Sequence, residues 1–93
     1  MKRILVYCLK ESEWHDFCKS IMDLANNSIT LYLEVREDSM IEHRTGSTYI
    51  KVTPENFDNL PLYIKVGYSD KVYLCNEDEW KAQATLNKMG RGL

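Results

Sequence analysis

The chain has 93 residues, of which 44% are hydrophobic and 28% are charged, and its formal net charge is −2. This length supplies one hydrophobic core, and the composition is that of a globular protein, so we expect residues 1–93 to form a single compact domain. The nearly neutral charge argues against binding to double-stranded nucleic acid, because such affinity comes largely from Lys and Arg that neutralise phosphates.

The apolar run near the N-terminus covers only residues 4–9, which is shorter than the apolar core of a signal peptide. No other stretch approaches the roughly 20 apolar residues of a membrane-spanning helix. We therefore expect a cytoplasmic protein without membrane contact. Three cysteines, an odd number, fit free thiols in a reducing compartment.

The first half of the chain predicts a strand, a helix and three further strands. KRILVYCL, residues 2–9, is apolar on both alternating faces, which is typical of a central strand covered on both sides. Apolar residues then recur with helical spacing, so Ser12 is the predicted N-cap of an amphipathic helix that ends at residues 26–28. The predicted strands that follow are 29–36, which alternates cleanly, a short irregular strand near 40–44, and TYIKV at 48–52.

The second half predicts a single helical turn, then a β-hairpin, and then a last helix. A single helical turn is expected at residues 53–60, before Pro61. LYIKV at 62–66 and KVYLC at 71–75 are the predicted strands of the hairpin.

The last predicted element is a helix over residues 77–89. Asn76 and Glu79 have the spacing of a capping box at its start. Its apolar face is thin, so we expect this helix to dock lightly or to serve two surfaces.

These elements predict an α+β domain in the order β-α-β-β-β-β-α. Its sheet would be mostly antiparallel, with four to five strands, the first helix packed on one face and a C-terminal helix after the sheet. A ferredoxin-like fold, β-α-β-β-α-β, is the alternative if one strand is wrongly assigned.

A repeated pattern suggests a binding surface. LYLEV at 31–35, TYIKV at 48–52 and LYIKV at 62–66 share a Tyr at the second position and a charge at the fourth. Strand propensity alone explains the repeat, but in one sheet these positions would gather on one apolar face, and such a face generally marks a partner. The predicted binding residues are Tyr32, Tyr49, Lys51, Tyr63, Lys65 and Tyr73.

Cysteine and histidine do not form a recognisable catalytic or metal motif. Cys8, His15 and Cys18 lack the two short ligand pairs of a zinc site. The loop after Cys8 also lacks the glycines of a phosphate-binding loop. We therefore predict no catalytic residues, no metal and no cofactor, with Cys8 and Cys18 as buried free thiols.

The sequence thus predicts a small non-enzymatic protein-binding module, of the kind found among accessory proteins and phage-type inhibitors. It would act through the Tyr/Lys sheet face or a sheet edge, on another protein or on a second copy through the sheet face. The alternative is a binder of a small ligand, a nucleotide or single-stranded nucleic acid, in which Tyr side chains stack on bases and lysines meet phosphates. The net charge favours the first prediction.

Overall fold

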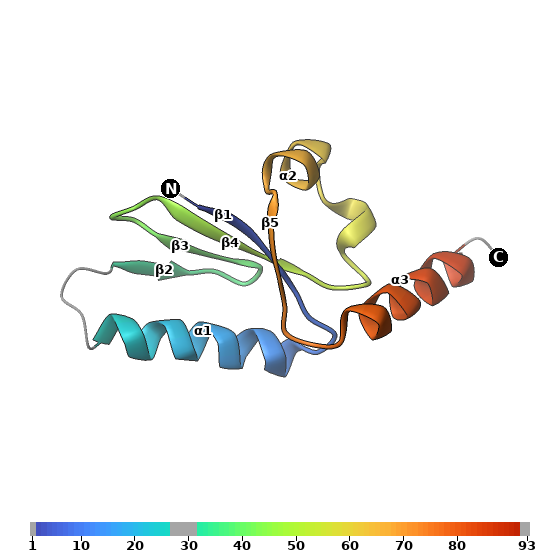
Figure 1. Cartoon of the computed structure of the whole chain (residues 1–93), viewed down its shortest axis with the longest axis horizontal. Helices are drawn as coiled ribbons and strands as arrows, with labels where there is room; N and C mark the ends of the chain where they lie inside the picture. Colours follow the sequence, from blue (N-terminus) through green and yellow to red (C-terminus); the bar gives the residue numbers. More distant parts are fainter. Residues whose placement is uncertain (1, 27–31, 92–93) are drawn as a thin grey trace.

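The computed structural model describes residues 2–26 and 32–91, which form a mixed five-stranded sheet with helices on both faces (Figure 1). The strand order is β2-β3-β4-β1-β5. In chain order the elements are β1 (Arg3–Tyr7), α1 (Glu11–Asn26), β2 (Leu33–Val35), β3 (Ser39–Glu42), β4 (Ser47–Val52), the 3₁₀ turn η1 (Phe57–Asn59), α2 (Leu62–Gly67), β5 (Asp70–Tyr73) and α3 (Glu77–Arg91).

The predicted α+β class is confirmed, but the sheet is not mostly antiparallel. β1 lies parallel to both of its neighbours, β4 and β5, whereas β2, β3 and β4 are joined by antiparallel pairs. The element order also differs from the β-α-β-β-α-β of the ferredoxin-like alternative. β4 and β5 run parallel on either side of β1 and cannot be joined by a tight turn, so the chain must cross over the sheet between them.

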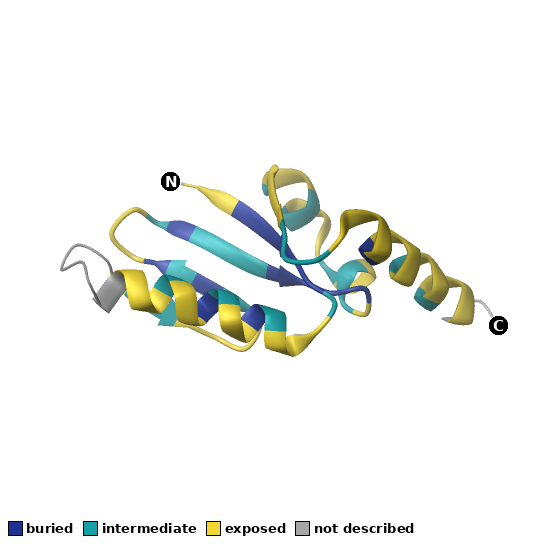
Figure 2. Ribbon diagram, turned by 60° about the horizontal axis from the view of Figure 1, so that its bottom comes forward, coloured by how far each residue is buried: buried dark blue, intermediate teal, exposed yellow. Residues whose placement is uncertain are grey.

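β1 is the central strand that its two apolar faces predicted. Ile4, Val6 and Cys8 are buried on the face that α1 covers, and Leu5 and Tyr7 are buried on the opposite face. Each face therefore has its own apolar layer, and Figure 2 shows that β1 is buried from its second residue onward.

α1 packs lengthwise on one face of the sheet (Figure 1). It begins at Glu11 rather than after Ser12, because the Glu13 carboxylate caps its start and accepts the backbone N–H groups of Leu9 at 2.6 Å and Lys10 at 2.9 Å. Trp14 and Cys18 enter the core beneath it. Of the predicted helix end at 26–28, residues 27–28 lie outside the described residues.

The strands at 40–44 and 48–52 are confirmed as the hairpin β3–β4, with Gly46 at φ 76° in its turn. The strand predicted over 29–36 is present only as β2, which has three residues. Residues 29–31 of that prediction lie outside the described residues.

A buried carboxylate organises the β3–β4 turn. Glu42 accepts the backbone N–H groups of Tyr32 at 3.1 Å, Arg44 at 3.0 Å and Thr45 at 2.8 Å, together with the Thr45 hydroxyl at 2.5 Å. The Thr45 hydroxyl and these backbone groups lower the pKa of Glu42 to about 2, although burial opposes the shift.

Because of Glu42, the free energy of unfolding should decrease as the pH falls in the acid range. Because the pKa of this carboxylate is lower in the folded state than the ordinary value of 4.5, its contribution is present above that pH and is lost as the pH falls toward 2. We expect Glu42→Gln to lower stability at neutral pH and to flatten the loss of stability in acid. Urea unfolding across this pH range measures both effects, with the exposed Glu37→Gln as the control. Equal acid sensitivity in Glu42→Gln and the wild type would contradict the prediction.

The segment LYIKV at 62–66 is a helix, not the predicted strand. Ile64 and Lys65 donate their N–H groups to the Pro61 carbonyl, and α2 follows from that turn. The residues that pack against the sheet are Leu60, Ile64 and Tyr68, which are four apart and so follow a helical period. This packing outweighs the strand propensity of Ile and Val, which is a weak preference that tertiary context can reverse.

The predicted β-hairpin between 62–66 and 71–75 is accordingly absent. The expected helical turn before Pro61 is present as η1, and η1 and α2 form the crossover segment, residues 53–69, which lies on the face opposite α1 (Figure 1). β5 then returns as an edge strand beside β1.

α3 is confirmed and extends to Arg91, two residues beyond its predicted end. Asn76 Oδ1 accepts the Glu79 N–H at 3.0 Å, which is the predicted N-cap. Trp80 and Ala84 in the first turns of α3 pack into the apolar layer opposite α1, and the rest of the helix projects away from the sheet (Figure 1). Among the described helices, none combines the length and apolar character needed to cross a membrane.

Candidate protein-binding surfaces

The predicted Tyr/Lys sheet face is not formed, because its residues lie on different surfaces. Tyr49 and Lys51 of β4 are in register with Ile4 and Val6, so they face α1. The Tyr49 ring makes an edge contact with Phe17 of α1, with 5.7 Å between ring centroids. Tyr49 is therefore part of the core on the α1 side.

The remaining predicted binding residues lie elsewhere. Tyr73 is on the opposite face, where its ring stacks on Tyr7 at 4.4 Å between centroids. Tyr32 precedes β2 at the far edge of the sheet and contacts the ring of His43. Tyr63 and Lys65 are both on α2. Thus the structure brings together only Tyr49 with Lys51 among these residues, since Tyr63 and Lys65 are two positions apart on a helix and point to different sides of it.

Lys51 is a buried cation that pairs with two exposed carboxylates, and it is not part of a binding surface. Lys51 is only 4% exposed. Its Nζ lies 2.5 Å from Glu11 Oε1 and 3.0 Å from Asp38 Oδ1. Burial opposes the charged form, but hydrogen bonds and attraction from Glu11 and Asp38 outweigh it, so the pKa of Lys51 is raised. This ammonium group ties α1 and the β2–β3 turn to β4.

The thiols lack the features of a reactive site. Cys8 and Cys18 are buried and free, as their apolar positions predicted. Burial, followed by the nearby charge of Glu13, raises the pKa of Cys8 to about 12. This is the opposite of the lowered pKa that activates a nucleophilic cysteine. His15 is exposed and faces Glu11. In the described part of the chain, no group of three or more His, Cys, Asp or Glu is placed to hold a metal ion.

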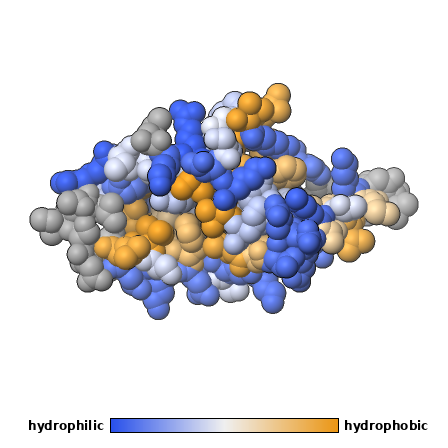
Figure 3. All heavy atoms as spheres, in the orientation of Figure 1, coloured by the Kyte–Doolittle hydropathy of each residue, from blue (hydrophilic) through white to orange (hydrophobic). Residues whose placement is uncertain are grey.

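The most exposed apolar residues of the described chain lie on α2. Leu62, Tyr63 and Val66 are 74%, 73% and 71% exposed. They occupy the outer side of the helix, whereas Ile64 packs inward against the sheet. We call these three residues the α2 surface. Figure 3 shows hydrophobic side chains gathered over α2, where the helix stands above the body of the protein.

Packing from beneath holds the α2 surface in place. Tyr68 at the end of α2 contacts the apolar layer around Trp80, and the Arg3 guanidinium lies 5.9 Å from the centre of its ring. The Lys65 ammonium lies 4.8 Å from the centre of the Phe57 ring, which is within the range of a cation–π contact. The exposed side chains therefore stand on a helix that is fixed on its inner side.

A groove between α1 and the end of β5 was not predicted from the sequence. It has a volume of about 330 Å³ and is lined by Glu13, Asp16, Phe17, Ser20 and Leu74. The four helical residues follow an i, i+3, i+4, i+7 spacing and therefore form one stripe along α1. That spacing is visible in the sequence, but nothing in it indicates that β5 would lie opposite this stripe.

Comparisons of the chain with protein-family models, with curated proteins and with solved structures give no significant match.

Proposed function

We propose that this protein is a small protein-binding module and that the α2 surface is where it contacts another protein. The observation that carries this proposal is the exposure of Leu62, Tyr63 and Val66, each above 70%, on one side of a short helix. Isolated exposed apolar residues are normal, but large neighbouring ones on a soluble protein are typical of interaction sites. The chemistry that fits them is an apolar hollow on the partner, with Tyr63 offering both a ring and a hydroxyl.

The arrangement supports binding rather than a role in the core. A side chain at this exposure contributes little to folding, so exchange for a polar residue would cost the fold little. The alternative function, stacking of bases on tyrosines beside lysines, requires those residues on one face. Since Lys51 is buried and Tyr49 and Tyr73 lie on opposite sides of the sheet, no observation favours it.

Photo-crosslinking tests the proposal directly. A benzophenone amino acid placed at Tyr63 should capture a protein from an extract of the source cells, whereas the same group at exposed Tyr32 serves as the matched control. The captured protein is then purified and its affinity measured by calorimetry. We expect Tyr63→Thr to weaken binding by about 2 kcal/mol while the unfolding midpoint stays nearly constant.

Two results would count against the proposal. One is capture at both positions alike, which would indicate nonspecific contact. The other is unchanged affinity of the purified partner for Tyr63→Thr and for Leu62→Gln. Sedimentation of the pure protein shows whether the captured partner is a second copy of the chain.

A further inference from the structure

Among the strands of the described residues, none pairs with the outer edge of β5. This strand is the last in the order β2-β3-β4-β1-β5. Leu74 donates its N–H to the Tyr7 carbonyl of β1 at 2.9 Å. Because backbone groups alternate in direction along a strand, those of Lys71 and Tyr73 point toward the open edge. Unpaired groups in such a row are a template for an added strand.

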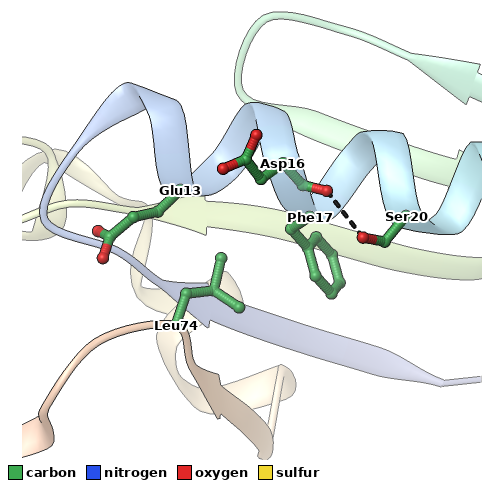
Figure 4. Close-up of a pocket in the computed structure, with 5 residues that line it drawn as sticks. All are labelled: Glu13, Asp16, Phe17, Ser20 and Leu74. Atoms are coloured by element: carbon green, nitrogen blue, oxygen red, sulfur yellow. Dashed lines mark hydrogen bonds between the residues drawn. The ribbon is translucent and has the colours of Figure 1, made fainter.

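The groove between α1 and β5 adjoins this edge on the face covered by α1. Phe17 and Leu74 approach each other across it, and Glu13 and Asp16 lie along its α1 side (Figure 4). Val72 pairs with Val6, so it faces the same side of the sheet as the groove, and it is 37% exposed. The edge therefore has an apolar flank beneath an acidic rim.

Charge determines which segment fits this site. Of the described residues that line the groove, two carry carboxylates and none is basic. Glu13 is held in place by the two backbone N–H groups that it accepts at the start of α1, and Asp16 is exposed. A basic side chain on the incoming segment would complement both of them.

We propose that the open edge of β5 binds an extended segment of a partner protein as an added strand. On the α1 side of that strand, one side chain would be apolar and contact Phe17 and Leu74. A neighbouring side chain on the same face, two positions along because strands alternate, would be Lys or Arg and would meet Glu13 and Asp16. This mode draws affinity from the backbone and specificity from alternate side chains. It does not depend on the α2 surface.

A matched pair of variants at Lys71 tests the strand addition. Lys71→Pro removes an N–H that points outward and leaves the groups that face β1, and proline is tolerated at such edge positions. Lys71→Ala removes the same side chain but keeps the N–H. The probe is a linear peptide selected from a random displayed library against the wild-type protein and then synthesised. We expect Lys71→Pro to weaken its binding about tenfold relative to Lys71→Ala, the loss of about one backbone hydrogen bond.

Hydrogen exchange of the intact protein gives a second readout. When the peptide binds, the amides of Lys71 and Tyr73 should exchange more slowly, whereas the Leu74 amide is already bonded to β1. Asp16→Lys should weaken the binding of a basic peptide, whereas Tyr63→Thr should leave its binding unchanged. The proposal is overturned if no peptide is selected, if the selected peptides lack the apolar and basic pair, or if the Lys71 variants bind equally. None of these results bears on the proposal that the α2 surface contacts another protein.

Discussion

Replacing Trp80 with alanine should lower the free energy of unfolding by about 3–5 kcal/mol, the range for removing a large aromatic side chain from a core. Trp80 is buried, and its ring makes T-shaped contacts with the rings of Tyr7 and Phe57 at centroid distances of 4.8 Å and 5.5 Å. Its indole N–H lies 3.2 Å from the Cys8 carbonyl and 3.3 Å from that of Val52. One side chain thus joins α3, β1 and β4.

The loss of stability should be large because few other apolar contacts attach α3 to the sheet. Beyond Trp80, only Ala84 of this helix packs against the apolar layer. A helix of 15 residues is marginal in water by itself, so we expect α3 to lose much of its helical structure in the variant. Trp80→Phe keeps most of the ring but leaves both carbonyls without the indole donor, and it should cost about 1–2 kcal/mol.

Chemical denaturation followed by circular dichroism measures both losses. Leu86→Ala is the matched control, since Leu86 is on the same helix and is exposed, and it should shift stability by no more than about 0.5 kcal/mol. If Trp80→Ala proved as mild as Leu86→Ala, the contacts of the indole could not be what anchors α3.

The elements predicted correctly are those whose patterns depend on local sequence. β1 shows apolar residues on both faces, which indicates a strand covered on both sides, and α1 shows a full helical period. Asn76 shows a cap that needs no distant partner. In LYIKV, by contrast, the apolar residues at 62, 64 and 66 suggest a strand, while Leu60, Ile64 and Tyr68 suggest a helix. Only the position of this segment over β1 decides between the two periods.

The location of the candidate site depends on strand register and strand order, which the sequence alone does not predict. Alternation shows which residues of a strand share a face, but it does not show how the faces of two strands correspond, because that depends on register and strand order. Tyr49 is in register with Ile4 and Tyr73 is in register with Tyr7, so the two tyrosines lie on opposite faces of the sheet. Tyr63 remained a candidate for a different reason, since α2 exposes it.

Replacing Lys51 with glutamate should destabilise the protein by several kcal/mol, the cost of burying a carboxylate without a partner. The new side chain would stand where an ammonium group now contacts Glu11 and Asp38, so three negative charges would meet. Lys65→Glu is the matched control at an intermediate position. It would lose mainly the contact with Phe57, which is worth about 0.5–1 kcal/mol.

Lys51→Met separates the role of charge from that of packing. Glu11 and Asp38 have side chains more than 60% exposed, so water can solvate both when the ammonium is absent, and we expect a loss of no more than about 1 kcal/mol. The pKa of Lys51 is raised by folding, so the ion pairs of Lys51 stabilise the protein below the ordinary lysine value of 10.5 and lose this effect as the pH rises through the folded-state value. In Lys51→Met, this loss of stability at alkaline pH should therefore be absent. Urea unfolding of the three variants at neutral and alkaline pH measures these differences, and a Lys51→Glu protein as stable as Lys51→Met would show that these ion pairs do not hold α1 against β4.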